Sequence, residues 1–268
     1  MKTELTKEIL EEYLNRGMTN RQIAEELGYS KSNIGHFIHK FGLVEKQEKY
    51  KLDNYRVESI DTKEKAYMLG FICCDAAINS KNVVELSVEK SDKEIIDYIS
   101  KLINCRVYVD NTYDKKAGRL PRARSCKKIP DIKTFVGGPL KKDRHFPITK
   151  KEFIRYALLG AFDSDGCLTW GRRKDKNRIW QKISFTTSLS IATGIQNVLI
   201  KELNISTVVR PKTGENCFVL EFANKNDVLK FLDYIYPNSD FIVLNRKYLK
   251  SKALRLELEE NGKGAAKQ

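Results

Sequence analysis

One segment pattern occurs twice in this chain, and this internal repeat constrains the fold more than any other feature. The stretch MLGFICCDA at 68–76 matches LLGAFDSDG at 158–166 at an offset of 90 positions, so Asp75 corresponds to Asp165. Both stretches are apolar enough for buried helices that end at the aspartate. A capping pair, Asp61 with Glu64 and Thr149 with Glu152, is expected to begin each helix.

The segments that follow each copy also correspond. Alternating or β-branched stretches predict strands, and apolar residues at helical spacing predict helices. Each half, 61–148 and 149–260, therefore reads αββαββα, an α+β unit with an antiparallel sheet. The predicted elements are strand 83–88, helix 92–103 and strands 106–113 and 119–128, then strands 167–173 and 178–187, helix 190–203, and strands 207–212 and 217–223. Residues 245–260 predict a last, charged helix, and 261–268 a frayed tail.

The first 45 residues form a different pattern. Thr19 and Gln22 make a capping box, and Gly28 and Ser30 mark a tight turn and a new helix start. This resembles a helix-turn-helix, which implies that the second helix enters the major groove of DNA. Its exposed N-terminal residues would be Lys31, Ser32, Asn33 and His36. A helical hairpin used for packing or dimerisation is the alternative. Residues 46–60 are charged and without clear period, which indicates a linker.

The charge balance favours a polyanionic partner. Lysine and arginine number 49 against 35 aspartate and glutamate, a net charge of +14 spread along the chain. Many dispersed cations suit a duplex, whereas a small acidic substrate needs only two or three. No apolar run reaches the ~18 residues of a membrane span, and the six cysteines form no CxxC pair. We expect a cytoplasmic, nucleoid-associated monomer with no membrane partner and no small-molecule cofactor.

The paired motifs resemble the two signature helices of the single-chain LAGLIDADG homing endonucleases, over residues 61 to about 255. The resemblance implies a saddle of two antiparallel sheets related by a pseudo-twofold axis. It also implies cleavage of double-stranded DNA with Mg²⁺ or Mn²⁺ held by Asp75, Asp165 and the backbone of Cys74 and Ser164. The catalytic lysines implied late in each half are Lys142, with Lys141 beside it, and Lys247.

Physical chemistry explains the residue types in the motif. Gly70 and Gly160 would let the two helices approach closely. A carboxylate at a helix C-terminus is electrostatically disfavoured, so two such ends side by side require cations, and hard oxygen ligands suit Mg²⁺. Asp163 has Cys73 as its counterpart and is expected to be accessory at most.

One position departs from the family pattern, because Ala76 stands where Gly166 stands in the second copy. If this position needs the left-handed conformation, alanine costs roughly 1 kcal/mol more than glycine. A displaced Asp75 would then lead to unequal cutting of the two strands.

The saddle implies DNA contacts from basic and aromatic residues in or beside the predicted strands. These are Arg119, Arg122, Arg124 and Lys127 in the first half, and Arg172, Arg173, Arg178, Trp180, Lys182, Arg210 and Lys212 in the second. Two other functions remain open: a DNA-binding transcriptional regulator on a non-cleaving scaffold, and an intron maturase. The setting expected is a bacterium or a bacteriophage, as part of a mobile element. A metabolic enzyme finds no support, since the chain has neither a phosphate-binding glycine loop nor a GxSxG motif.

Overall fold

The computed structural model describes residues 5–16, 18–43, 55–111, 120–173, 178–213, 217–236 and 241–265. The chain divides into two units, Met1–Asp53 and Asn54–Gln268, which are treated separately below. Among the helices within these ranges, none combines the length and the apolar character that a membrane crossing requires.

The smaller unit contains three helices, α1 (Lys7–Asn15), α2 (Asn20–Leu27) and α3 (Lys31–Lys40). The predicted capping box is confirmed, because Thr19 accepts from the backbone of Gln22 and the Gln22 side chain accepts from Thr19. Gly28 ends α2 with φ 69°, and Ser30 caps α3. Ile23 and Ile34 lie in the buried core between the helices, so the sequence pattern directly yields this small fold.

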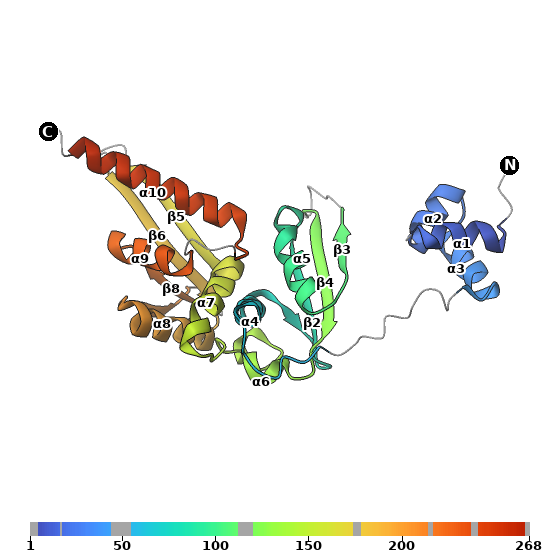
Figure 1. Ribbon diagram of the computed structural model, residues 1–268, viewed down its shortest axis with the longest axis horizontal. Helices are drawn as coiled ribbons and strands as arrows, with labels where there is room; N and C mark the ends of the chain where they lie inside the picture. The colour runs from blue at the N-terminus through green and yellow to red at the C-terminus, as the bar shows by residue number, and fades with distance from the viewer. Residues whose placement is uncertain are drawn as a thin grey trace. The chain divides into compact units, whose positions relative to one another are not determined.

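The larger unit repeats one order of elements. Its first half consists of α4 (Lys63–Asp75), β1 (Ala77–Ile78), β2 (Val83–Glu89), α5 (Lys93–Leu102), β3 (Val107–Asp110), β4 (Arg122–Lys128) and α6 (Ile132–Val136). The second consists of α7 (Lys151–Asp165), β5 (Gly166–Arg173), β6 (Arg178–Thr187), α8 (Leu189–Leu203), β7 (Val208–Pro211), β8 (Phe218–Phe222) and α9 (Lys225–Ile235), followed by α10 (Asn245–Ala265). The predicted order αββαββα is confirmed in both halves (Figure 1).

Each half has a four-stranded antiparallel sheet, in the orders β1-β2-β4-β3 and β5-β6-β8-β7. Burial alternates along the strands, as in β2, where Val84, Leu86 and Val88 are buried and the residues between them reach solvent. We call the face with the buried residues the covered face and the other the open face. In the first half α5 contacts β2 and β4, and in the second α8, α9 and α10 contact β6.

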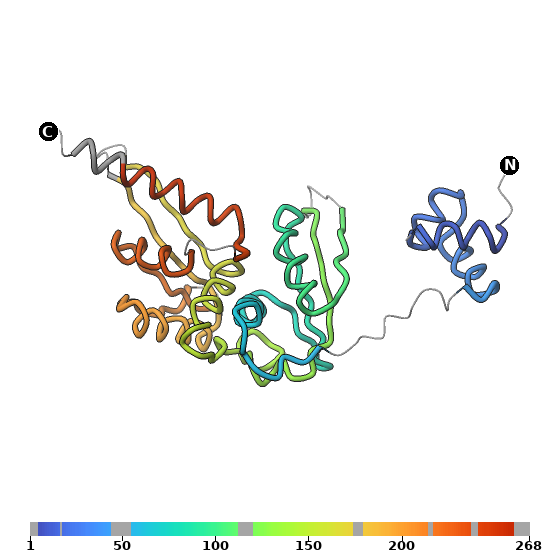
Figure 2. Tube along the Cα trace, in the orientation of Figure 1, coloured from blue at the N-terminus to red at the C-terminus, as the bar shows by residue number. Residues whose placement is uncertain are grey.

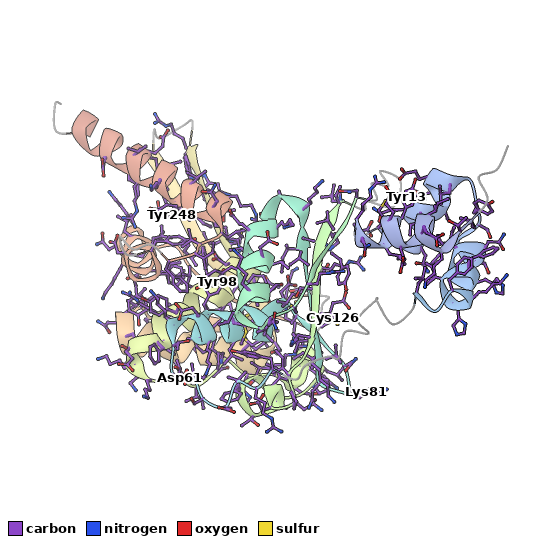
Figure 3. The ribbon with its side chains drawn as sticks, turned by 45° about the vertical axis from the view of Figure 1, so that its right-hand side comes forward. Tyr13, Asp61, Lys81, Tyr98, Cys126 and Tyr248 are labelled. Atoms are coloured by element: carbon purple, nitrogen blue, oxygen red, sulfur yellow. The ribbon has the colours of Figure 1, made fainter. Side chains whose placement is uncertain are left out.

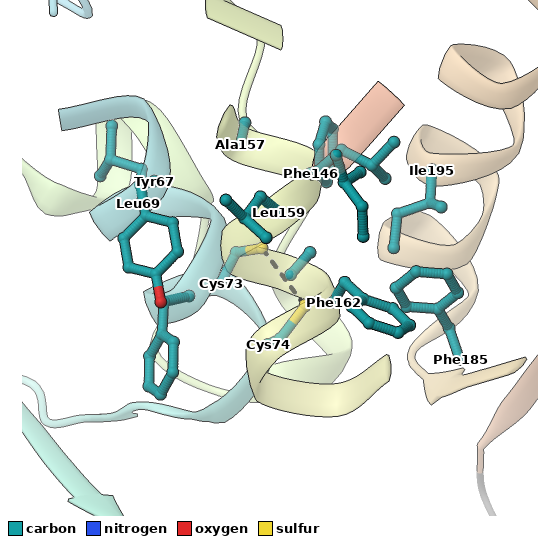
Figure 4. Packing of buried hydrophobic residues seen from close by; sticks show 14 of the residues in the cluster. Tyr67, Leu69, Cys73, Cys74, Phe146, Ala157, Leu159, Phe162, Phe185 and Ile195 are labelled. Atoms are coloured by element: carbon teal, nitrogen blue, oxygen red, sulfur yellow. Dashed lines mark hydrogen bonds between the residues drawn. The ribbon is translucent and has the colours of Figure 1, made fainter. Parts of the chain in front are cut away.

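The two halves meet where α4 packs against α7, a contact that we call the helix seam. A Cβ at Gly70 would lie 2.0 Å from the Ala157 carbonyl oxygen, and one at Gly160 would lie 2.1 Å from that of Tyr67. The two backbones therefore touch, which only glycine permits. Figure 4 shows the packing around the seam, with Phe162 of α7 against Phe185 of β6.

Three boundaries differ from the sequence-based expectations. Thr62, not Asp61, caps α4, and Asp61 instead pairs with Lys65; Lys150 precedes α7 without a side-chain cap, so Thr149 has no capping role. The expected linker is shorter, because Val57 is fully buried and Asp131 accepts from its backbone N–H, which attaches this stretch to the first half. Residues 44–54 lie outside the described part.

The last helix is longer than predicted, since α10 continues to Ala265 into the expected tail. Figure 2 shows the coloured part of α10, in red, along the second half. Its side chains are described as far as residue 259. Leu254 and Leu258 are buried against the second half, so the helix belongs to that half rather than projecting freely.

Candidate active site

The two motif aspartates stand at corresponding places in the fold. Asp75 is the last residue of α4 and Asp165 the last residue of α7, so the helix seam places both helix ends together. Asp75 reaches solvent, whereas the Asp165 side chain is 14% exposed. The pKa of Asp75 is raised, first because surrounding protein limits its hydration and second because of the charge on Asp165. Desolvation likewise raises the pKa of Asp165.

A lysine from the first half contacts the aspartate of the second half. Lys141 begins a short 3₁₀ turn, Lys141–Asp143, and its Nζ lies 2.6 Å from Asp165 Oδ2. The sequence favours Lys142, its neighbour in the same turn. Since the turn directs the Lys141 side chain to the carboxylate, Lys141 replaces Lys142 in the candidate site.

Lys247 is buried beneath the site rather than facing it. Its Nζ donates to the carbonyl oxygens of Phe162 at 2.6 Å, Asp163 at 2.8 Å and Gly166 at 2.6 Å. The Phe162 and Asp163 carbonyls belong to the last turn of α7, where carbonyls run out of helical partners, and the Phe162 carbonyl also accepts from the Gly166 backbone N–H. Burial lowers the pKa of Lys247 to about 8. The predicted lysine is therefore close to Asp165 in the fold, but its ammonium group caps the helix.

Arg144, which the sequence did not single out, caps the end of α4 as Lys247 caps the end of α7. Its Nη1 donates to the carbonyl oxygens of Ala76 at 2.7 Å and Ile72 at 3.3 Å, and its Nη2 to that of Pro139 at 2.6 Å. Each signature helix thus ends on a buried cation, which offsets the partial negative charge of a helix C-terminus. From the sequence we expect bound metal to offset the negative charge at the two helix ends. The protein itself supplies part of this positive charge through Arg144 and Lys247.

Asp163 ties the two halves together below the site. It is 2% exposed, and its Oδ2 accepts from the Tyr67 hydroxyl on α4 and from the Leu244 backbone N–H before α10. Burial raises its pKa to about 6. The side chain therefore serves the packing of three segments.

The concern over Ala76 is not supported by the backbone. Ala76 has φ −75° and ψ 148°, and Gly166 has φ −71° and ψ 148°. Both are extended conformations that any residue adopts, so the expected left-handed strain was wrong. Glycine is needed at 166 for another reason, because a Cβ there would lie 2.3 Å from Cδ2 of Phe162.

The open faces of the sheets carry most of the predicted DNA contacts. In the first half Arg122 and Arg124 lie there with Tyr108, whose side chain is 54% exposed. In the second half Arg173, Trp180, Lys182 and Arg210 share the open face. Figure 3 shows Cys126, two residues beyond Arg124 on β4. Lys212 follows β7 and is exposed.

Two predicted contacts face the other way. Lys127 lies on the covered face of β4, because burial alternates along this strand. It is 5% exposed, and its Nζ donates to the Asn104 carbonyl. Arg172 lies on the side of β5 that α10 covers and pairs with Glu257 at 2.7 Å. We leave both out of the candidate interface. Arg119 lies outside the described residues, and of Arg178 only the backbone is described, in β6.

The exposed side of α3 is polar in the way that the sequence indicated. Lys31, Ser32, Asn33 and His36 are all exposed, while Ile34 and Ile38 face the core. DNA binding by this helix stays a prediction.

The oxygen donors at the two helix ends suit a hard divalent cation that takes most of its ligands from water and phosphate. Among the described residues, no group of three or more His, Cys, Asp or Glu side chains is arranged so that it could hold a metal ion by itself. Mg²⁺ in nucleic-acid enzymes is typically held by one or two carboxylates, with water and phosphate completing its shell. Arg144 and Lys247 bond to other carbonyls than those of Cys74 and Ser164. The two aspartates and these carbonyls are thus suitable in chemical type.

The comparisons with known proteins agree with this architecture. Residues 152–236 match the family model described as a LAGLIDADG-like domain. The matched residues include the second motif, at the end of α7, and the match supports the family resemblance read from the sequence. A search of curated protein sequences gives no significant match.

Solved structures with the same fold extend over both halves. The I-LtrWI LAGLIDADG homing endonuclease, solved bound to target DNA, has a TM-score of 0.51 and 10% identity, covering 74% of this chain and 91% of that one. The LAGLIDADG meganuclease I-AabMI, solved bound to uncleaved DNA, has a TM-score of 0.50 and 12% identity, covering 75% and 95%. The two-unit LAGLIDADG fold therefore spans the larger unit.

Proposed function

We propose that the protein is a site-specific endonuclease that acts on double-stranded DNA as a monomer. The observation that carries this proposal is that Asp75 and Asp165 end the two helices of the helix seam, in a unit whose two sheets have basic residues on their open faces. The DNA-bound structures of I-LtrWI and I-AabMI support the choice of partner. The remaining basic residues of the open faces would contact phosphates and major-groove base edges.

Asp75 and Asp165, with the carbonyls of Cys74 and Ser164, would hold Mg²⁺ or Mn²⁺. A bound divalent ion supplies Lewis-acid activation of the phosphate and lowers the pKa of bound water. The chain's own contribution is charge placement. Lys141, beside Asp165, is positioned to neutralise a phosphoryl oxygen, while Arg144 and Lys247 hold the two helix ends in place.

The N-terminal unit would add a second contact with the duplex. Its helix α3 exposes Lys31, Ser32, Asn33 and His36 near the N-terminal end, as a recognition helix would. A linked second module raises affinity by making the second binding event intramolecular. We propose that it lengthens the recognised site.

A non-cleaving regulator is the second candidate, because Arg144 and Lys247 stabilise the helix ends without any metal. The test is cleavage of a randomised duplex library with Mg²⁺ by the intact protein and by Asp75→Asn and Asp165→Asn. Binding is measured in parallel with Ca²⁺. Defined double-strand cuts that are lost in either variant, with binding retained, would establish the nuclease.

Tight, sequence-specific binding without cutting by the intact protein would instead establish the regulator. Preference for a structured intron RNA over every duplex would favour the maturase. Both results would overturn the proposed cleavage function.

A further inference from the structure

A small cavity lies beside Asp75, between the two halves of the larger unit. Its volume is about 170 Å³, and its lining includes Asp75 of α4, Ser87 of β2 and Arg122 of β4. The opposite wall comes from the second half, with Ser164 and Arg246. The cavity therefore joins the Asp75 side of the candidate site to the first-half sheet.

Arg122 is held in a defined orientation at this cavity. Its Nε donates to Ser87 Oγ at 2.7 Å and its Nη2 to the Ser87 carbonyl at 2.6 Å. A guanidinium has five N–H groups in a rigid fork, so these two bonds orient it without exhausting its donors. The side chain is half-buried, on the open face of β4.

Three other charged residues of the cavity lining, Asp92, Asp163 and Arg246, form hydrogen bonds with groups other than Arg122. Arg246 binds the Asp92 carboxylate through Nε at 3.1 and 3.0 Å, and Asp163 accepts from Tyr67 and Leu244. Glu89, the cross-strand neighbour of Arg122, also lines the cavity. The hydrogen bonds described for Arg122 go to a neutral serine, and its side chain lines the same cavity as Asp75.

The electrostatics of Asp75 are consistent with this placement. Desolvation and the charge of Asp165 raise its pKa, and the positive charges of Lys141 and then Arg122 act in the opposite direction. Lys141 is bonded to Asp165 at 2.6 Å. Lys141 therefore acts on both aspartates and is bonded to Asp165, whereas Arg122 lines the cavity on the Asp75 side.

We propose that Arg122 is a catalytic residue of the Asp75 site, where its guanidinium contacts the scissile phosphate of one strand, while Lys141 serves the Asp165 site on the other. This inference rests on the proposed nuclease function. Arginine binds phosphate through two parallel hydrogen bonds, whereas lysine acts as a point charge. The two strands would then be hydrolysed at chemically different sites, and the asymmetry would come from the cations rather than from Ala76.

The test measures the two strands separately. An intact duplex that contains a site cut by the protein is labelled on both strands and incubated with excess protein and Mg²⁺ in single-turnover conditions. Arg122→Ala is expected to slow one strand about 100-fold, as loss of a transition-state donor does, and the other less than about threefold. Lys141→Ala is expected to slow the opposite strand, so the two variants move the strand ratio in opposite directions.

Three further variants separate catalysis from binding and folding. Arg124→Ala, two residues along the same face, is expected to raise Kd and to slow both strands by the same factor. Arg122→Lys keeps the charge without the fork, and Ser87→Ala removes one anchor of the guanidinium. Both are expected to move the strand ratio in the direction of Arg122→Ala by a smaller factor, about three- to tenfold. If Arg122→Ala fails to fold, Arg122→Lys and Ser87→Ala still test the expected change in the strand ratio.

Equal slowing of both strands by the Arg122 variants, or a change in Kd alone, would overturn the inference while leaving the nuclease intact. Movement of the ratio in the same direction by Arg122→Ala and Lys141→Ala would also overturn it. An intact protein that cuts neither strand of any duplex would instead overturn the proposed function itself.

Discussion

At the scale of single residues, the glycines of the helix seam are under the strictest steric limit. A Cβ at Gly160 would lie 2.1 Å from the Tyr67 carbonyl oxygen and 2.8 Å from the Phe71 nitrogen, both of them backbone atoms. Gly160→Ala must therefore push α4 and α7 apart. We expect a loss of about 3 kcal/mol in the free energy of unfolding, the upper end of ordinary overpacking. Urea denaturation followed by circular dichroism measures it.

Gly171→Ala is the matched control. The nearest atom to its Cβ would be Trp180 Nε1 at 3.0 Å, in an exposed side chain that can move. The expected change is within about 1 kcal/mol. Equal effects of the two substitutions would show that the helix seam tolerates separation.

Asp163 makes stability depend on pH. Burial raises its pKa from 3.8 to about 6, so the folded state binds its proton more tightly than the unfolded state. The resulting stabilisation is complete below about pH 4 and is lost as pH rises through about 6. Relative to Asp163→Asn, the intact protein should gain up to about 3 kcal/mol between pH 7 and pH 4. Urea titrations of both proteins in chelator-containing buffers test this, and a constant difference across this range would contradict it.

At the scale of elements, the segment 241–247 fastens the second half to the first. Phe241 packs against Tyr67, Tyr98 and Tyr156, and Arg246 binds Asp92, whose side chain is 11% exposed. Arg246→Ala would leave the Asp92 carboxylate without its partner in a largely dry place. Since Arg246 itself is 58% exposed, we expect a moderate loss of about 2 kcal/mol.

Arg255→Ala provides the comparison within one half, because Arg255 pairs with Asp233, whose side chain is 65% exposed. Its expected cost is below about 1 kcal/mol. Hydrogen exchange should show faster exchange at the junction of α5 and α10 only in Arg246→Ala. Faster exchange there in both variants, or in neither, would argue against the fastening role.

At the scale of the whole molecule, the N-terminal unit is expected to add to binding and not to the fold of the larger unit. The two units have separate hydrophobic cores, and the division falls between Asp53 and Asn54. A protein of residues 54–268 should therefore keep the urea midpoint of the larger unit. Under the proposed function, its Kd for the intact duplex that the protein recognises should rise more than about tenfold, because the linked N-terminal unit is lost.

Fluorescence anisotropy at fixed salt measures this change, because affinity for a duplex by a chain of net charge +14 depends steeply on ionic strength. In the full chain, His36→Ala is expected to raise Kd in the same direction as removal of the N-terminal unit, but by a smaller factor. An unchanged Kd for residues 54–268 would assign the smaller unit a role other than DNA contact.

Much of the architecture was predictable because it depends on local periodicity. Apolar spacing and β-branched alternation report helices and strands directly, so the order αββαββα, the range 178–187 of β6 and the capping box at Thr19 follow from the chain itself. The repeat likewise identified Asp75 and Asp165, since both motif helices end at these residues.

The direction and environment of the charged side chains required the tertiary structure. Whether a basic residue faces solvent depends on which face of its strand packs on helices, and so Lys127 and Arg172 differ from their neighbours. Buried cations such as Arg144 have no sequence signal, because their partners are backbone carbonyls distant in the chain. The sequence by itself determined the elements and the two aspartates, whereas long-range packing decided which cations surround them, because burial and partnership exist only in the folded chain.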